Sequence, residues 1–244
     1  MRYKCIVTYD GTNYFGFQLQ KKFRTIQSEI EQTISKVLKQ DIKIYAAGRT
    51  DAKVHALGQV FHFDTDVIMS AKRMQNAINY RISKDIYIQS VELVSEEFHS
   101  RFSVLKKEYH YYIDFGKHNP FLKNYRYFYP YSKKVDWEKF KSAASIFIGT
   151  HDFKSFTKNH KLENTIRTIY SIDFSIKDTL IIVKIVGDGF LHNMVRILIG
   201  MLLEVGRGNY TIDDLKLIMN EKNRELAPKI APPNGLYLYK VYYK

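Results

Sequence analysis

The sequence is poor in cysteine and has no long hydrophobic run. Its single cysteine, Cys5, rules out a disulfide within the chain and a zinc site built on paired cysteines. No stretch reaches the ~18 consecutive apolar residues that a membrane-spanning helix requires. The opening residues MRYKCIVTYDG also lack the apolar core of a signal peptide. These absences predict a cytoplasmic protein without a membrane partner.

Acidic residues are outnumbered: 25 Asp and Glu stand against 38 Lys and Arg, which gives a net charge of +13. Such an excess favours a polyanionic partner, nucleic acid before an anionic membrane surface. The alternative is that lysine serves only as polar surface filler. A membrane-surface role is disfavoured because no predicted helix combines a basic face with an exposed apolar face.

The predicted secondary structure runs β-α-β-β-α-β, and this order occurs twice. In the first half, apolar alternation and helical spacing predict strands at 4–10, 42–48, 58–66 and 85–94 and helices at 24–40 and 70–82. In the second half they predict strands at 108–115, 165–176, 179–189 and 235–244 and helices at 136–149, 190–206 and 211–221. The expected N-caps are Thr25, Ser70 and Asp136, and Gly149 is the expected stop of the third helix.

This repeated order predicts an α+β protein of two ferredoxin-like (βαββαβ) halves, residues 1–105 and 106–244. The two halves share the order of their elements and no sequence identity. Residues 114–136, in the middle of the chain, hold two prolines and many tyrosines. This segment is either an extended connection or an RNA-facing surface in which aromatic and cationic residues alternate.

The stretch GRTDAKVHALGQV, residues 48–60, places Asp51 between Arg49 and Lys53. Two nearby cations would lower the pKa of the aspartate and keep it ionised, as a carboxylate nucleophile must be. The alternative, and the usual meaning of an isolated RTD, is an aspartate that caps the amides of a turn. His55 has no second ligand at metal-binding spacing, so we expect it to be a packing residue.

The strand expected at 108–115 places Tyr109 and Tyr111 on one face. A tyrosine in such a position can stack on a base that has been extruded from a helix. The alternative is a tyrosine that covers the surface of a sheet.

Residues 190–206 are apolar almost all round, which predicts a buried helix. Spacings of three and four would bring His192, Asn193 and Arg196 onto one face of that helix. A buried arginine needs an anionic partner, since leaving it unpaired costs several kcal/mol. The candidate partners are Asp188, Glu204 and Asp51.

Seven sequence blocks together resemble the tRNA pseudouridine synthase A (TruA) family. They occur in the family's order and span nearly the whole chain: YDGTNYFGFQ.Q, R(T)IQ.E, GRTDA.VHA.GQV.HF, FH.RFS...K.Y.Y, G.HDF.SF, GFL.NMVR...G.LLEVG and GLYL..V.Y. The resemblance implies an extended mixed or antiparallel sheet with helices on one face and a basic central cleft.

The resemblance also implies a reaction: uridine becomes pseudouridine in the anticodon stem-loop of tRNA, at tRNA positions 38–40. No metal or organic cofactor takes part, and the enzyme acts as a homodimer. Asp51 falls on the nucleophile, Tyr109 on the residue that stacks on the target base, and Arg196 on the arginine that pairs with the aspartate. Arg49 belongs to the catalytic block. His192, Asn193 and Lys53 are the further substrate-binding candidates.

The chain departs from the family's usual pattern at two places. Lys53 stands where the family most often has glycine, and Arg81-Ile82-Ser83 stands where it commonly has Leu-Pro. Both departures bear on the choice of RNA more than on the chemistry. A paralogue acting on ribosomal RNA and a non-catalytic RNA-binding protein are therefore kept as alternatives.

Overall fold

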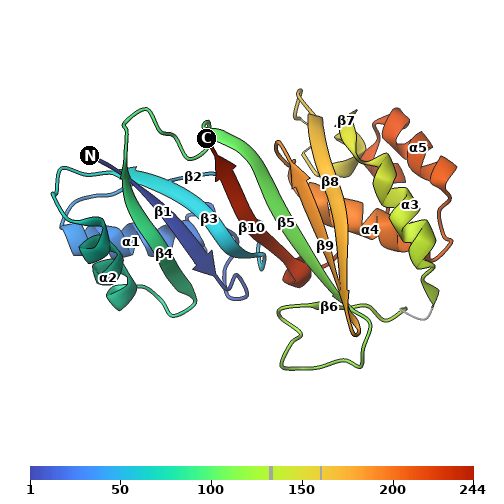
Figure 1. Cartoon of the computed structure of the whole chain (residues 1–244), viewed down its shortest axis with the longest axis horizontal. Helices are drawn as coiled ribbons and strands as arrows, with labels where there is room; N and C mark the ends of the chain where they lie inside the picture. The colour runs from blue at the N-terminus through green and yellow to red at the C-terminus, as the bar shows by residue number, and fades with distance from the viewer. Residues whose placement is uncertain (132–133, 160) are drawn as a thin grey trace. The chain divides into compact units, whose positions relative to one another are not determined.

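The computed structural model describes residues 1–131, 134–159 and 161–244 (Figure 1). The chain forms two compact units, one of residues 1–107 and 237–244 and the other of residues 108–236. Both units combine a sheet with helices, so the prediction of an α+β protein is confirmed. Part of the tyrosine-rich segment 114–136, namely residues 132–133, lies outside the described residues.

The sheet of the first unit has the order β4-β1-β3-β10. Three long antiparallel strands form it: β1 (Arg2–Tyr9), β3 (His55–Asp64) and β4 (Ile86–Val94). The short strand β2 (Tyr45–Ala46) pairs with β3 in antiparallel orientation, and β10 (Leu236–Tyr243) pairs with β3 in parallel orientation. The sheet is therefore mixed.

Alternation along β1 shows which face of this sheet is covered. Its four alternate side chains are buried, and those between them are partly exposed: the buried set is Tyr3, Cys5, Val7 and Tyr9. Two helices supply the other side of this core, α1 (Ile26–Leu38) and α2 (Ala71–Arg81), which contact each other. Thr25 and Ser28 form a capping box at the start of α1, and Ser70 caps α2, as predicted.

The sheet of the second unit has the order β5-β9-β8-β7. Its strands are β5 (Val104–Asp114), which enters the unit at Glu108, β7 (Gly149–Asp152), β8 (Ile166–Lys177) and β9 (Leu180–Gly187). The short β6 (Tyr127–Phe128) pairs in parallel with β5. The hairpin between β8 and β9 turns at Asp178, which adopts a left-handed φ of 54°.

Three helices pack in the second unit: α3 (Trp137–Ile146), α4 (Met194–Gly206) and α5 (Ile212–Glu221). Short 3-10 turns, η2 (Lys154–Phe156), η3 (Arg224–Leu226) and η4 (Pro233–Gly235), connect the larger elements. Nearly every residue of α4 is buried, as its all-round apolar character predicts. Within the described ranges, no helix has both the length and the apolar character to cross a membrane.

Several boundaries differ from the sequence-based predictions. Strand β2 is two residues long rather than seven, and α3 ends at Ile146, so Gly149 opens the unforeseen β7 instead of stopping the helix. The final strand, which the sequence placed in the second half, belongs by its contacts to the first unit, because Tyr237 and Leu238 pair with β3. Such long-range backbone pairing leaves no local signal in the sequence.

Candidate functional site

Asp51 lies in the loop that joins β2 to β3, and its side chain is half-buried. The backbone of this loop is tied to the segment that follows β1. The amide of Phe17 donates to the carbonyl of Thr50 (3.1 Å), and the amide of Lys53 donates to the carbonyl of Tyr14 (3.2 Å). The amide of Val54 donates back to the carbonyl of Asp51 (3.2 Å), which closes a tight turn. Main-chain bonds on both sides therefore fix the position of the aspartate.

Two glycines let the segment after β1 approach this loop. A Cβ atom at Gly11 would lie 2.0 Å from the carbonyl oxygen of Val54, and one at Gly16 would lie 2.8 Å from that of Thr50. Gly16 also has a φ of +90°, which side-chain-bearing residues rarely adopt. The block YDGTNYFGF thus acts as a backbone support for the Asp51 loop.

Buried polar side chains hold the same loop from the sheet side. The hydroxyl of Thr50 hydrogen-bonds that of Tyr9 (2.8 Å), and the amide nitrogen of Gln59 donates to the carbonyl of Gly48 (2.9 Å). Burial raises the pKa of the Tyr9 hydroxyl, so this group stays neutral and serves as a fixed hydrogen-bonding partner. None of these residues was singled out from the sequence, because a strand tyrosine or glutamine carries no local signal of its contacts.

His55 is buried at the start of β3. Its Nδ1 accepts a hydrogen bond from the amide of Gly11 (3.1 Å), and its ring stacks on Tyr237 (4.7 Å between centroids). These contacts confirm the interpretation of His55 as a hydrogen-bonded packing residue. It links the Asp51 loop to both β1 and β10.

The two cations next to Asp51 in sequence have different surroundings. The Arg49 side chain is exposed, and its Nη1 donates to Oε1 of Gln18 (2.7 Å), again in the segment after β1. Lys53 is exposed and adopts a left-handed φ of 64°. A glycine, which the resemblance leads one to expect at this position, would take this conformation without steric cost.

Tyr109 lies on β5 in the second unit and is buried. Its ring meets the edge of Phe190 (5.1 Å between centroids, 79° between planes). Edge-to-face packing of this kind fixes the orientation of a tyrosine ring.

Arg196 lies in the first turn of α4 and is half-buried. Its Nε donates to the carbonyl of Ala231 (2.8 Å), and the Ala231 amide donates to the carbonyl of Arg196 (3.1 Å). Its positive charge also opposes the rise that burial and Tyr127 cause in the pKa of Tyr111. Two acids considered as structural partners of Arg196 have other contacts: Asp188 accepts from the Thr168 amide, and Glu204 binds Arg207 and Asn209.

The prediction that His192, Asn193 and Arg196 share one helical face is wrong. Helix α4 begins at Met194, and Asn193 is its N-cap with a φ of 62°, a conformation outside the helical region. His192 precedes the helix and is exposed, and its carbonyl accepts from Oγ1 of Thr157 (3.2 Å). The apolar run from residue 190 includes a turn before Met194, which apolar character alone does not distinguish from a helix.

The predicted site residues therefore fall in both units. Arg49, Asp51 and Lys53 lie in the first unit, and Tyr109, His192, Asn193 and Arg196 lie in the second. Across residues 1–131, 134–159 and 161–244, no group of three or more His, Cys, Asp or Glu is placed to hold a metal ion.

Comparisons with known proteins match the chain over nearly its whole length. A family model described as tRNA pseudouridine synthase matches residues 5–103 and 143–244. The tRNA pseudouridine synthase A of Anoxybacillus flavithermus is 44% identical over 244 residues, covering 99% of this chain and 98% of that protein. The protein of the same name from Geobacillus sp. is 44% identical over 245 residues, with the same coverage.

The tRNA pseudouridine synthase A 1 of Bacillus cereus (strain ATCC 14579) is 45% identical over 246 residues, covering 99% of this chain and 98% of that protein. Among solved structures, a chain of "Crystal Structure of a Cbf5-Nop10-Gar1 Complex" matches with 13% identity and a TM-score of 0.36. That match covers 82% of this chain and 54% of the solved chain.

Proposed function

The chain belongs to the tRNA pseudouridine synthase family, and from this premise we propose that it isomerises uridine in the anticodon arm of tRNA with Asp51 as the nucleophile. The assignment of Asp51 rests on one observation, the way the neighbouring backbone holds its loop. Close-packed glycines and hydrogen bonds on two sides fix the backbone that carries this half-buried aspartate. An aspartate that only capped a surface turn would need no such support.

In the proposed reaction, the bond between N1 of uracil and C1′ of the ribose breaks, the uracil turns, and C5 bonds to C1′. The proton leaves C5 and N1 gains one, so the product is an isomer and no co-reactant is required. Attack by Asp51 at the sugar and attack at the base both begin from an ionised carboxylate. Arg49 and Arg196 are the proposed catalytic arginines, because a fixed arginine holds the carboxylate in its reactive orientation, a preorganisation effect.

A uridine within a stem has to leave its stack before a side chain can reach it, which costs a few kcal/mol. Tyr109 is proposed to offset part of this cost by stacking on the uracil, and its packing against Phe190 supports that role by holding the ring still. His192, Asn193 and Lys53 are proposed to bind the RNA backbone near the reacting nucleotide. The exposure of His192 and Lys53 is compatible with such contacts.

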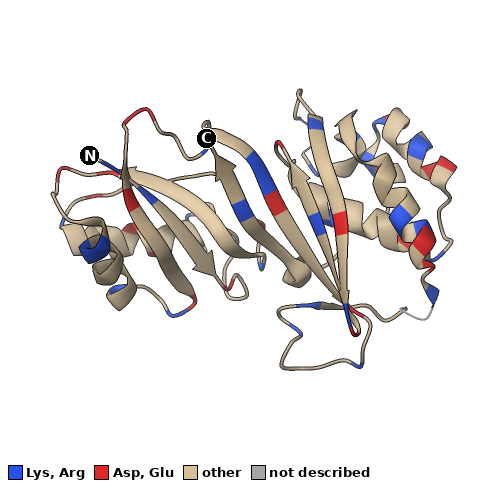
Figure 2. Ribbon diagram, viewed as in Figure 1, with Lys and Arg blue, Asp and Glu red and all other residues tan. Residues whose placement is uncertain are grey.

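The net charge of +13 suits a structured RNA, whose phosphates dominate affinity. Figure 2 shows Lys and Arg positions along the loop that follows β5, at the bottom of the view. Between residues 115 and 131 this loop has no acidic residue. Some of its aromatic rings pack on one another, as Tyr127 and Tyr129 do (5.6 Å), while Phe121 is exposed. We propose that the exposed part of this loop faces RNA.

We further propose that the protein acts in the cytoplasm as a homodimer, as the resemblance implies. Sedimentation equilibrium measures the mass of the particle in solution. A monomer at micromolar concentration would contradict the proposed dimer and leave the proposed chemistry untouched.

The experiment that tests the function incubates the protein with unmodified tRNA transcripts and maps pseudouridine in the product. We expect product with the wild type, none with Asp51→Asn, and wild-type product with Asp41→Asn, which removes an exposed acid of the same unit. RNA binding should survive Asp51→Asn. No product from correctly folded wild type on any tRNA would refute the proposal, and product with Asp51→Asn would refute the nucleophile.

Mapping pseudouridine in a deletion strain separates the remaining alternatives. Loss of the modification from tRNA supports the proposal. Loss from ribosomal RNA alone would replace it with the paralogue, and loss from neither RNA would favour a non-catalytic binder.

A further inference from the structure

A row of four aromatic rings crosses one end of the first unit, where the loop between β4 and β5 meets β3. Tyr45 stacks on His62 (5.2 Å between centroids), His62 meets His99 edge-on (4.7 Å), and His99 lies against Phe102 (4.3 Å). These four residues form the ring row. The FH.RFS block, which the proposed chemistry does not use, supplies two of its members.

The inner and outer members of the ring row differ in exposure. His62 is 1% exposed, whereas Tyr45 is 51% and Phe102 is 76% exposed. The exposed Phe102 sits on a closed turn: Nδ1 of His99 accepts from the amides of Arg101 (3.1 Å) and Phe102 (3.4 Å). An apolar ring that is exposed and also held by local bonds is preorganised for binding.

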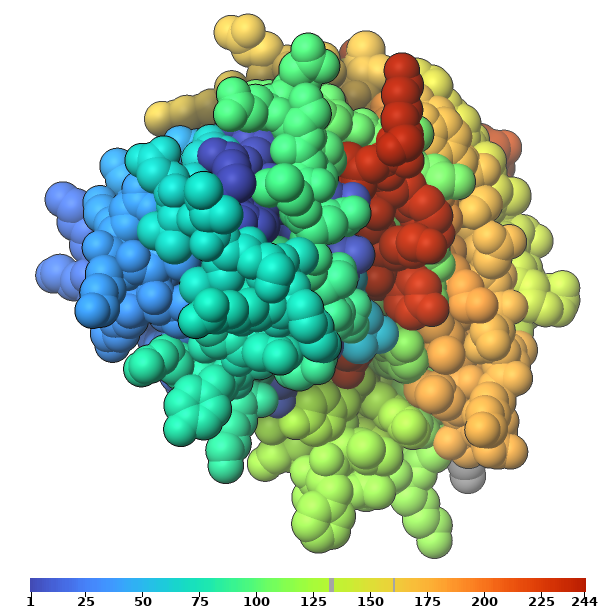
Figure 3. Space-filling view, turned by 60° about the vertical axis from the view of Figure 1, so that its left-hand side comes forward, coloured from blue at the N-terminus to red at the C-terminus, as the bar shows by residue number. Residues whose placement is uncertain are grey.

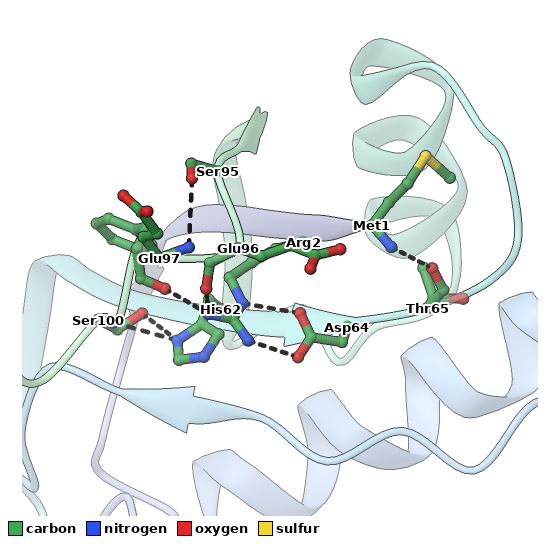
Figure 4. A network of polar contacts seen from close by, with 10 residues as sticks. Met1, Arg2, His62, Asp64, Thr65, Ser95, Glu96, Glu97 and Ser100 are labelled. Carbon is green, nitrogen blue, oxygen red and sulfur yellow. Dashed lines mark hydrogen bonds and ion pairs between the residues drawn. The ribbon is translucent and has the colours of Figure 1, made fainter.

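The loop that carries Phe102 is anchored to the sheet by Arg2 and His62 (Figure 4). Arg2 donates to the carbonyls of Glu96 and Phe98 (2.8 Å to the latter) and pairs through two bonds of 2.8 Å with Asp64. Nδ1 of His62 hydrogen-bonds the hydroxyl of Ser100 (2.9 Å). These bonds join the start of β1, the end of β3 and the loop into one support.

Cations lie over aromatic rings on the same part of the molecule. The Arg101 guanidinium is 5.7 Å from the Phe102 ring, and Nζ of Lys4 is 5.4 Å from the Phe98 ring and 5.1 Å from the Tyr243 ring. Figure 3 shows the C-terminal strand in red beside the green segment near residue 100, and the Tyr243 hydroxyl donates to the carbonyl of Ser100 (2.7 Å). Arg101 and the exposed Phe102 ring therefore lie together on the loop that the C-terminal strand supports.

The histidine rings of the ring row are neutral, and the positive charge near them belongs to other side chains. Burial, with a contribution from Arg2, lowers the pKa of His62 to about 4 and also lowers that of His99. Both histidines are thus uncharged near neutral pH, so the positive charge comes from arginine and lysine. Asp64 pairs with Arg2 and Glu92 pairs with Lys4 (2.8 Å), while Glu96 and Glu97 of the same loop are exposed.

We propose that the ring row and Arg101 form a second RNA contact on the first unit, one that takes an unpaired nucleotide. A base stacks on the exposed face of Phe102 or Tyr45, and Arg101 binds the adjoining phosphate. Interleaved aromatic and cationic groups are how proteins hold single-stranded nucleic acid, and every base has a face that can stack. The contact therefore adds affinity and is tolerant of sequence.

The position of the ring row shows that its nucleotide is not the target uridine. Strand β3 begins at His55, close to Asp51, and His62 lies seven residues further along it. At ~3.3 Å per residue, this places the ring row roughly 20 Å from the Asp51 loop. The inference rests on the proposed function, because it assigns the second contact to the same RNA.

The test measures the affinity of a labelled single-stranded oligoribonucleotide and of a tRNA transcript by fluorescence anisotropy. We expect Phe102→Leu to weaken binding of both probes about 10-fold and to raise KM for tRNA in proportion. Phe102→Tyr, which keeps a ring, should bind like the wild type. The control Tyr87→Leu removes a ring of the same unit that is 56% exposed and lies outside the ring row, and it should have no effect.

Affinity of Phe102→Leu within twofold of the wild type would overturn the inference, as would an equal loss with Tyr87→Leu. A change in sedimentation with Phe102→Leu would also overturn it, because the ring would then belong to a contact between protein chains. Wild-type turnover on the same transcript is scored separately, so failure of the proposed function is distinguishable from failure of the second contact.

Discussion

Replacing Gly16 with alanine perturbs the Asp51 loop without touching any side chain of the proposed chemistry. The new Cβ atom would lie 2.8 Å from the carbonyl oxygen of Thr50 and 3.2 Å from the carbonyl carbon of Asp51. Ordinary contact begins at 3.4 Å, so the loop has to move by about 0.6 Å. The residue that moves is the one next to the proposed nucleophile.

Two costs are expected from Gly16→Ala. The first is backbone strain, ~1–2 kcal/mol for an L-residue in the left-handed region. The second is loss of rate, because a displacement near 1 Å from reactive geometry costs up to ~10²-fold. A shift of about half that size predicts a fall in kcat of roughly 10-fold or more, with little change in the affinity for tRNA.

Gly208→Ala is the matched control for this substitution. Gly208 also has a positive φ, 79°, but no atom lies within 4 Å of its added Cβ, and it belongs to the second unit. Gly208→Ala should therefore cause backbone strain without any close contact. At ~2–4 °C per kcal/mol for a chain of this size, both variants should melt a few degrees below the wild type. Only Gly16→Ala should lose turnover.

Single-turnover kinetics on a saturating tRNA transcript, together with thermal unfolding, make the comparison. If Gly16→Ala turns over like Gly208→Ala, then close packing of the segment after β1 against Thr50 does not position Asp51. A loss of turnover in both variants would point to general destabilisation and refute it equally.

Two further predictions follow from backbone strain and from burial. Lys53→Gly should raise the free energy of unfolding by up to about 1 kcal/mol, since glycine relieves the strain of the left-handed φ at some cost in chain entropy. A lower melting temperature would contradict this expectation. The same substitution should reduce the salt dependence of tRNA binding by about one phosphate contact. Burial lowers the pKa of His62 from 6.5 to about 4 in the folded protein, so the free energy of unfolding should fall as pH drops below 6.5, by about 2 kcal/mol at pH 5. Denaturant unfolding of His62→Gln should lack this part of the pH dependence, and an identical profile would refute it.

Local sequence signals predicted the secondary structure well where a cap or a period was present. Thr25, Ser70 and Asp136 are the N-caps of α1, α2 and α3, as predicted. Such caps are recognisable because a side-chain oxygen at an N-cap accepts from free amides within the next three residues. The predicted start of α4 is wrong because no such capping signal marks it. Apolar residues continue through the turn before Met194, and the left-handed conformation of Asn193 has no strong signal of its own.

The candidate site was predicted residue by residue through the family resemblance and only weakly from the residues themselves. Without the resemblance, the residues around Asp51 favour an aspartate that caps a turn. The structure shows what supports the Asp51 loop: Gly11, Gly16 and the Tyr9–Thr50 hydrogen bond. These residues are visible in the sequence, but nothing near them in the sequence indicates this role. A glycine needed for close approach looks the same in a sequence as a glycine in any turn.

The sequence by itself determined the charge, the two-fold order of elements, the helix caps and the chemical family, since these depend on composition and on neighbours within a few residues. Only the tertiary structure decided that β10 joins β3, that the segment after β1 holds the Asp51 loop, and that Tyr45, His62, His99 and Phe102 form one row. Each of these depends on the approach of segments far apart in the chain, and the packing of the whole unit fixes that approach.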